Sequence, residues 1–127
     1  MIIRTGIDLV EIHRLEQIDP KIRKRFLERV FTIQEIKECK DSNQALSGRF
    51  AVKEAVVKAL GTGIGVVSWR DVETITGPWG EPILHLYGKA RQYADLLGLT
   101  DWSVSITDSG DLAAAVAVAV GTESQKT

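Results

Sequence analysis

The sequence predicts one domain of the α+β class, with helices mostly in the first half of the chain and antiparallel strands in the second. Three observations support this class. Apolar residues recur at helical spacing through much of residues 9–60, strand-like segments begin near residue 70, and 127 residues fit one domain. We place the domain at residues 1–121 and expect residues 122–127 to form a flexible tail.

The chain is predicted to begin with a short strand, "MIIRTGID" at 1–8, followed by a helix at 9–18 with apolar residues at every third position. Asp19 and Pro20 are the residue types expected at the cap and the first position of a second helix, over about 20–29. We expect that helix to bury three apolar side chains: Ile22, Phe26 and Leu27.

Two further helices complete the first half. "TIQE" at 32–35 has the spacing of a capping box and indicates the start of a short helix. A long helix should run from about 43 to 60 and end at "GTGIG".

The second half is strand-rich. "RDVETIT" and "PILHLY" read as strands joined by the turn "GPWGE", and "KARQYADLLG" reads as a helix that ends before Gly98. "WSVSIT" at 102–107 alternates apolar and polar residues. "LAAAVAVAV" at 112–120 is alanine-rich, which favours a helix, but valines alternate with alanines after a turn, so we predict a strand.

Composition excludes several classes of protein. The net charge of −1 argues against a nucleic-acid binder. Cys39 is the only cysteine, which fits a reducing compartment. The N-terminus does not resemble a secretory signal, and no apolar run reaches the roughly 18 residues of a membrane helix. We therefore expect a cytoplasmic protein with no membrane partner.

Two carboxylates are candidate metal ligands. Glu54 lies near the edge of the buried stripe of the long helix, and Asp8 follows an apolar strand. Mg²⁺ uses one or two carboxylates and keeps its other positions for water and substrate phosphate. The alternatives are ordinary: Glu54 can form an exposed i, i+4 pair with Lys58, and Asp8 can cap the helix at 9–18.

Two other stretches have both a structural and a functional interpretation. "GTGIG" at 61–65 resembles a phosphate loop but follows a helix, so Gly61 can be a simple C-cap; a phosphate there would need backbone N–H groups, a metal or Lys58. Residues 20–30 carry five basic residues and one acid, with Arg14 upstream. This is either a solvated face or a docking surface for an acidic partner.

These stretches together resemble holo-acyl-carrier-protein synthase, of the 4′-phosphopantetheinyl transferase superfamily and its short trimeric type. The matching segments are "GIDLVEIHR", "RFLERVFTIQE", "GRFAVKEAVVKALGTGIG", "DVE", "GEP" and "VSITDS", in family order over nearly the whole chain. The resemblance implies an antiparallel-rich sheet packed against the long helix, short N-terminal helices, and a homotrimer with interfacial active sites.

The resemblance also implies an activity and roles for residues. The family moves 4′-phosphopantetheine from coenzyme A to a serine of apo acyl carrier protein, releases adenosine 3′,5′-bisphosphate and supports fatty-acid or polyketide synthesis. Asp8 and Glu54 would hold Mg²⁺, for which Mn²⁺ is a possible substitute. Lys58 would bind the transferred phosphate. Glu54, directly or through a metal-bound water, is the best-placed base. The remaining roles follow the same motifs: Arg49, Gly61, Thr62, Gly63 and Pro82 would line the coenzyme A pocket, and Arg14 and Arg25 would dock the carrier protein.

Asp108 is the one departure from the family pattern, which commonly has histidine there. An acid near the coenzyme A nucleotide would repel a phosphate unless it turns away or binds a cation. The alternative function is therefore a non-catalytic module that binds acyl carrier protein or coenzyme A. A trimeric structural protein is a third possibility, but it leaves the basic segment and "GTGIG" unexplained.

Overall fold

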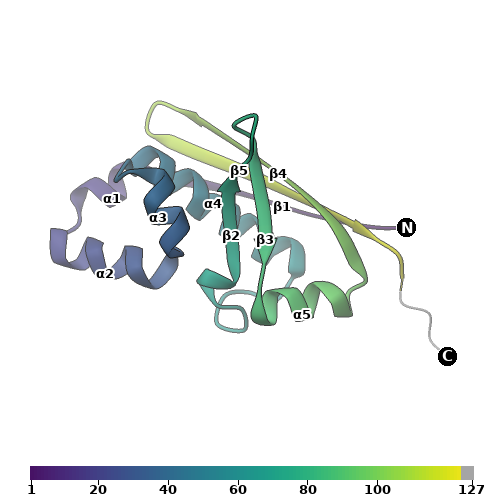
Figure 1. The fold of residues 1–127 in the computed structure, drawn as a ribbon. Helices are drawn as coiled ribbons and strands as arrows, with labels where there is room; N and C mark the ends of the chain where they lie inside the picture. Colours follow the sequence, from purple (N-terminus) through teal and green to yellow (C-terminus); the bar gives the residue numbers. More distant parts are fainter. Residues whose placement is uncertain (124–127) are drawn as a thin grey trace.

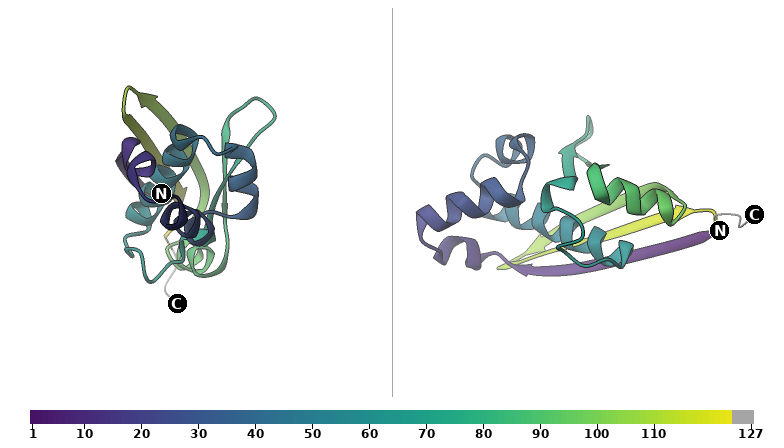
Figure 2. Two further views of the ribbon diagram at one scale, coloured as in Figure 1. Left: turned by 90° about the vertical axis from the view of Figure 1, so that its left-hand side faces the viewer. Right: turned by 90° about the horizontal axis from the view of Figure 1, so that it is seen from below.

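A computed structural model describes residues 1–123. In chain order its elements are β1 (Ile2–Glu11), α1 (His13–Gln17), α2 (Pro20–Val30), α3 (Ile33–Cys39), α4 (Asn43–Leu60), a 3₁₀ turn (Trp69–Asp71), β2 (Val72–Thr76), β3 (Pro82–Leu86), α5 (Gly88–Leu96), β4 (Leu99–Ser109) and β5 (Leu112–Gly121). Figure 1 shows the short helices α1 to α3 gathered at one end of the long strands, and Figure 2 shows the same grouping from two other sides. The α+β prediction is confirmed; the tail predicted at 122–127 lies mostly outside the described residues.

The strands form two antiparallel sheets. One has the order β1-β5-β4, and the other is the β2–β3 hairpin. β1 pairs with β5 along its whole length, from Ile2 opposite Gly121 to Glu11 opposite Leu112. Consequently β1 crosses the fold as one ten-residue strand, and its alternate residues face α4.

Small side chains let α4 lie close to the large sheet. Every second residue of β5 is a buried alanine, while the valines point to the other face of the sheet. The buried face of α4 also carries alanines, at 51, 55 and 59. Alanine opposite alanine allows a closer approach than larger side chains would, which explains the repeated alanines of "LAAAVAVAV".

Gly6 extends this close contact to β1. A Cβ atom at Gly6 would lie 1.8 Å from the carbonyl oxygen of Ala55 and 3.0 Å from the amide nitrogen of Ala59. Only a residue without a side chain can therefore occupy this point of β1. Asp8 is two residues further along and faces the same helix, since side chains alternate along a strand.

The predicted helix at 9–18 is wrong. Residues 9–11 continue β1, and α1 covers only His13–Gln17. The spacing of the apolar residues suits a short helix, but the ladder to β5 holds the chain extended as far as Glu11. Asp8 therefore lies inside a strand opposite Ala115 and does not cap a helix.

The other helix predictions agree with the structure, with one exception. α2 begins at Pro20 after the cap Asp19, Thr32 and Glu35 form the capping box of α3, and α4 spans residues 43–60. Ile22, however, is 59% exposed rather than buried. Leu27 and Val30 are the residues of α2 that are buried in the smaller core, which α1, α2, α3 and the start of α4 share, and Phe26 packs against it.

Candidate active site

The structure brings Asp8, Glu54 and Lys58 together from β1 and α4. The Lys58 ammonium donates to Asp8 Oδ1 at 3.1 Å and to the carbonyl oxygen of Ile7 at 3.0 Å. Glu54 lies one helical turn before Lys58. No ion pair joins Glu54 to Lys58 among residues 1–123, so the surface i, i+4 pair is not what forms; Lys58 bonds to Asp8 instead.

The charges of this cluster favour a cation between the carboxylates. Burial raises the pKa of Glu54, the nearby charge of Asp8 raises it further, and Lys58 opposes both effects. Two carboxylates that repel each other in a partly buried place gain from a shared divalent ion. The donor set therefore fits Mg²⁺, with Lys58 left as a positive charge for an anionic substrate.

Gly61 and Arg4 hold the C-terminal end of α4. Gly61 has a φ of +75° and its N–H bonds back to the carbonyls of the last turn, so it is the C-cap that its position predicted. The Arg4 guanidinium donates to the carbonyl oxygens of Ala59 and Leu60, at the negative end of the helix dipole. The sequence reading missed Arg4, although its alternation with Gly6 and Asp8 could have placed it on the same face.

Two of the predicted pocket residues follow directly after α4. The hydroxyl oxygen of Thr62 is buried and lacks a hydrogen-bond partner within residues 1–123. Gly63 has a φ of +71° and open space where a Cβ would be. Thr62 follows Lys58 by four residues, so this loop begins about one helical turn after the lysine of the cluster.

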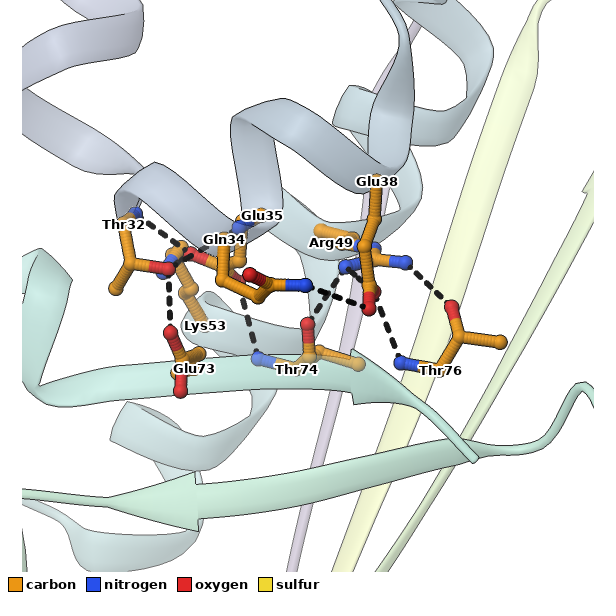
Figure 3. A network of polar contacts seen from close by, with 9 residues as sticks. All are labelled: Thr32, Gln34, Glu35, Glu38, Arg49, Lys53, Glu73, Thr74 and Thr76. Carbon is orange, nitrogen blue, oxygen red and sulfur yellow. Dashed lines mark hydrogen bonds and ion pairs between the residues drawn. The ribbon is translucent and has the colours of Figure 1, made fainter. Parts of the chain in front are cut away.

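Arg49 and Pro82 are not part of that cluster or of the loop. Arg49 and Lys58 are nine residues apart on α4, which places them on opposite sides of the helix. Figure 3 shows the Arg49 guanidinium pointing to α3 and β2, where it contacts Glu38 at 2.9 Å and the carbonyl oxygen of Thr74 at 2.6 Å. Pro82 begins β3, beyond the turn that follows β2.

The predicted docking residues lie on α1 and α2. Both Arg14 and Arg25 are exposed, and Arg14 contacts Glu11 at 2.8 Å. A cavity of about 530 Å³ is lined by Asp8 and Arg14 together with apolar side chains that include Ile18, Ile22 and Phe26. The cavity places Arg14 on the same wall as Asp8, which the sequence alone did not show.

Asp108 turns toward the first turn of α4. Its carboxylate accepts a hydrogen bond from the side-chain amide of Gln44. That position is at the positive end of the helix dipole, which stabilises an acid. Asp108 was the argument for a non-catalytic module, because an acid there would repel a phosphate. That argument is weaker now, since the carboxylate is hydrogen-bonded to Gln44 within the same chain.

A second polar cluster was not predicted. Glu11, His13 and Asp111 bring ligand-type atoms within 4.8 Å of one another. Asp111 accepts from the backbone N–H of His13 at 2.9 Å and also bonds to its ring, so it caps the start of α1 from 98 residues away. The Asp111 hydrogen bond raises the pKa of His13. No local pattern could have paired residues so distant in the chain.

Fold and site together define a small α+β protein in which a carboxylate pair and a lysine from one strand and one long helix lie together. A model of the ACPS family, described as the 4′-phosphopantetheinyl transferase superfamily, matches residues 4–117. The chain is 44% identical over 124 residues to the holo-[acyl-carrier-protein] synthase of Herpetosiphon aurantiacus, a match that covers 92% of this chain and 98% of that protein.

Solved structures agree. The Helicobacter pylori holo-[acyl-carrier-protein] synthase in complex with coenzyme A has a TM-score of 0.83 and 35% identity, over 91% of this chain and 99% of that chain. The holo-[acyl-carrier-protein] synthase of Neisseria meningitidis has a TM-score of 0.82 and 30% identity, over 92% and 97%. The chain belongs to the 4′-phosphopantetheinyl transferase superfamily. None of the helices in residues 1–123 combines the length and apolarity needed to cross a bilayer.

Proposed function

We propose that this protein is a holo-acyl-carrier-protein synthase, which transfers 4′-phosphopantetheine from coenzyme A to a serine of apo acyl carrier protein. The observation that carries the proposal is the meeting of Asp8, Glu54 and Lys58 at one place, in a chain that belongs to this superfamily. The serine oxygen attacks the phosphorus that carries pantetheine. The bond from that phosphorus to the bridging oxygen breaks, and adenosine 3′,5′-bisphosphate leaves.

Each residue of the cluster has a distinct part. Lys58 binds the transferred phosphate and balances the charge that grows on its oxygens. Glu54 takes the proton of the serine hydroxyl, and its raised pKa brings it closer to the working pH of a base. Asp8 holds the Lys58 ammonium in place through the 3.1 Å contact.

Asp8 and Glu54 are also the residues that would hold Mg²⁺, with Mn²⁺ as a possible substitute. When bound, the ion would neutralise charge on the coenzyme A pyrophosphate and orient it. Burial and the charge of Asp8 raise the pKa of Glu54, and a divalent ion held between the two carboxylates would offset that repulsion and favour the ionised oxygens that it prefers as ligands.

The loop after α4 is proposed to bind coenzyme A. Thr62 and Gly63 would offer their backbone N–H groups, and Thr62 would add its buried hydroxyl, whereas the N–H of Gly61 already bonds to the last turn of α4 and Gly61 would contribute its positive φ. Pro82 belongs to the same pocket in the proposal but lies with the β2–β3 hairpin. In a homotrimer with interfacial sites, a second copy of the chain would supply the hairpin to this pocket.

An exposed apolar sheet face supports assembly with other copies. Ile3, Ile7 and Leu9 of β1 point away from α4 and are 61%, 68% and 62% exposed. A contiguous apolar patch of this kind is typical of an interface. We infer a homotrimer with interfacial sites, a cytoplasmic location, and docking of the acidic carrier protein on Arg14 and Arg25.

Intact-mass spectrometry tests the proposal directly. An apo acyl carrier protein is incubated with the protein and coenzyme A, once with Mg²⁺ and once with a chelator. We expect a gain of one phosphopantetheine only with Mg²⁺, and its loss in Glu54→Ala and Asp8→Ala. A folded protein that binds carrier protein yet modifies none of several carriers would favour the non-catalytic module.

A further inference from the structure

The free edge of β2 is hydrogen-bonded by side chains instead of a neighbouring strand. The N–H of Thr74 donates to Glu35 Oε2 at 3.0 Å, and the N–H of Thr76 donates to Glu38 Oε1 at 2.9 Å. The carbonyl oxygen of Thr74 accepts from Arg49 at 2.6 Å. Residues two apart in a strand present these groups on one edge, so the side chains occupy the place of a missing strand. Figure 3 shows this row between α3 and β2.

The side chains of the row are themselves paired by charge. Lys53 and Glu35 contact each other at 2.7 Å and are completely buried, and Lys53 also donates to the carbonyl oxygens of Trp69 and Val72. Arg49 and Glu38 form the second pair, at 2.9 Å. The two bases are one turn apart on α4 and the two acids nearly one turn apart on α3, so the pairs form successive rungs. We call these four residues the charged ladder.

Arg49 has little left to offer a phosphate. Its side chain is only 11% exposed, and it donates to Glu38, to the Thr74 carbonyl and to the Thr76 hydroxyl. Burial opposes ionisation of Glu38, but hydrogen bonds from the Thr76 N–H, Arg49 and Gln34 outweigh it and lower its pKa to about 2. A phosphate approaching Arg49 would therefore have to compete with a carboxylate that is permanently charged.

The ladder holds the β2–β3 hairpin on the body of its own chain. β2 leads into the turn 77–81 and then to Pro82, the residue that each copy would supply to the pocket of a neighbouring copy. The turn projects from the fold with Trp79 89% exposed, so few other contacts hold it. The position of Pro82 relative to α4 then depends on the bonds between α4, α3 and β2.

We propose that Arg49 and Glu38 are positioning residues, which hold the β2–β3 hairpin in place for coenzyme A instead of contacting coenzyme A themselves. This inference rests on the proposed function, because it concerns the pocket to which Pro82 belongs. In this proposal Glu38 supports the binding of an anionic substrate although its own charge would repel a phosphate, because it acts through the position of the hairpin.

Kinetics of Glu38→Gln and Arg49→Met separate the alternatives. We expect both substitutions to raise the KM for coenzyme A by roughly tenfold, with little change in kcat or in the KM for carrier protein, since a displaced contact weakens binding. The double variant should be no worse than Arg49→Met alone, because both changes break one rung. Thr76→Val, which keeps every charge, should raise the same KM by a smaller factor. Asp95→Asn, which removes an exposed acid paired with Arg91, is the matched control.

Two results would overturn the proposal. If Arg49 binds phosphate directly, Glu38→Gln frees its guanidinium and the KM for coenzyme A falls or stays constant while Arg49→Met raises it. If the ladder only stabilises the fold, both variants melt at lower temperature and the KM does not change.

Hydrogen exchange gives a measurement that does not need turnover. The backbone N–H groups of residues 72–77 and 79–81 should exchange faster in Glu38→Gln than in the unsubstituted protein, and unchanged exchange there would contradict the proposal. Calorimetric titration with coenzyme A should show weaker binding to Glu38→Gln and Arg49→Met, by a factor similar to the rise in KM. A protein that binds coenzyme A and shows these changes, but modifies no carrier, would refute the transferase while leaving the ladder supported.

Discussion

Replacing Gly6 by alanine would place a methyl carbon 1.8 Å from the carbonyl oxygen of Ala55. Real Cβ atoms essentially never approach another heavy atom within 3.0 Å, so β1 and α4 would have to separate by about 1.2 Å or more. The obstacle is backbone, so no rotamer change at Ala55 can relieve it. Overpacking of this kind costs about 1–3 kcal/mol of unfolding free energy.

The separation would also open the proposed site. Asp8 is two residues from Gly6 on the same face, and its contact with Lys58 is 3.1 Å. Adding about 1 Å takes that distance beyond a hydrogen bond. A displacement of about 1 Å at reacting groups can reduce the rate about 100-fold. We therefore expect Gly6→Ala to lose roughly that factor in kcat/KM while the chain still folds.

The assay is the mass-spectrometric transfer reaction, run with thermal unfolding of the same preparations. Gly48→Ala is the matched control, because its Cβ would meet the side chain of Ile106, at 2.8 Å, and no backbone atom of another element. Within a helix, alanine is favoured over glycine by up to about 1 kcal/mol, which offsets part of that contact. Adding Ala55→Gly to Gly6→Ala should rescue nothing, because the clashing oxygen remains. Activity of Gly6→Ala within twofold of the unmodified protein, with an unchanged melting temperature, would refute this reasoning.

Three further predictions concern stability and titration. The pKa of Glu38 is lowered from 4.5 to about 2, so its charge stabilises the fold fully above pH 4.5, and this contribution is lost as the pH falls toward 2. Its upper limit is about 3 kcal/mol. Glu38→Gln should therefore flatten the pH dependence of stability measured by chemical denaturation. The pKa of His13 is raised in the folded protein, so its contact with Asp111 stabilises the fold most below the ordinary histidine pKa, and this stabilisation is lost as the pH rises through the pKa of the folded state. In an NMR titration, Asp111→Asn should lower the pKa of His13. Thr32→Ala should cost about 1 kcal/mol by removing the cap of α3, whereas Thr32→Ser should cost less, as urea unfolding would show.

Elements with local signals at both ends could be predicted from the sequence. α4 was expected at about 43–60, ending at the glycine-rich "GTGIG", and the structure gives these bounds with Gly61 as the C-cap. The strand at 1–8 was predicted too short because its partner, β5, lies more than 100 residues later. Pairing at that distance leaves no mark in a window of ten residues.

Residues of the site divide in the same way. The i, i+4 spacing of Glu54 and Lys58 predicted an exposed ion pair, but Lys58 contacts Asp8 of β1 instead, a partner fifty residues away in the chain. Lys53 precedes Glu54 in the sequence, yet its side chain is completely buried against Glu35. The sequence alone does not tell a buried lysine from an exposed one; here the packing of α3 on α4 buries Lys53.

The fold uses opposite sides of α4 for two different requirements. The side that carries Glu54 and Lys58 must stay partly open, since a substrate and an ion have to reach the carboxylates, and Lys58 is accordingly 53% exposed. The side that carries Arg49 and Lys53 must stay closed, since a buried ion pair that loses one partner is costly. Charges on one side of the helix are therefore left available for ligands, while those on the other are neutralised by α3 and β2. Removing a charge should thus have opposite effects on the two sides: on the open side it should reduce turnover more than stability, and at the buried Lys53–Glu35 pair it should reduce stability first.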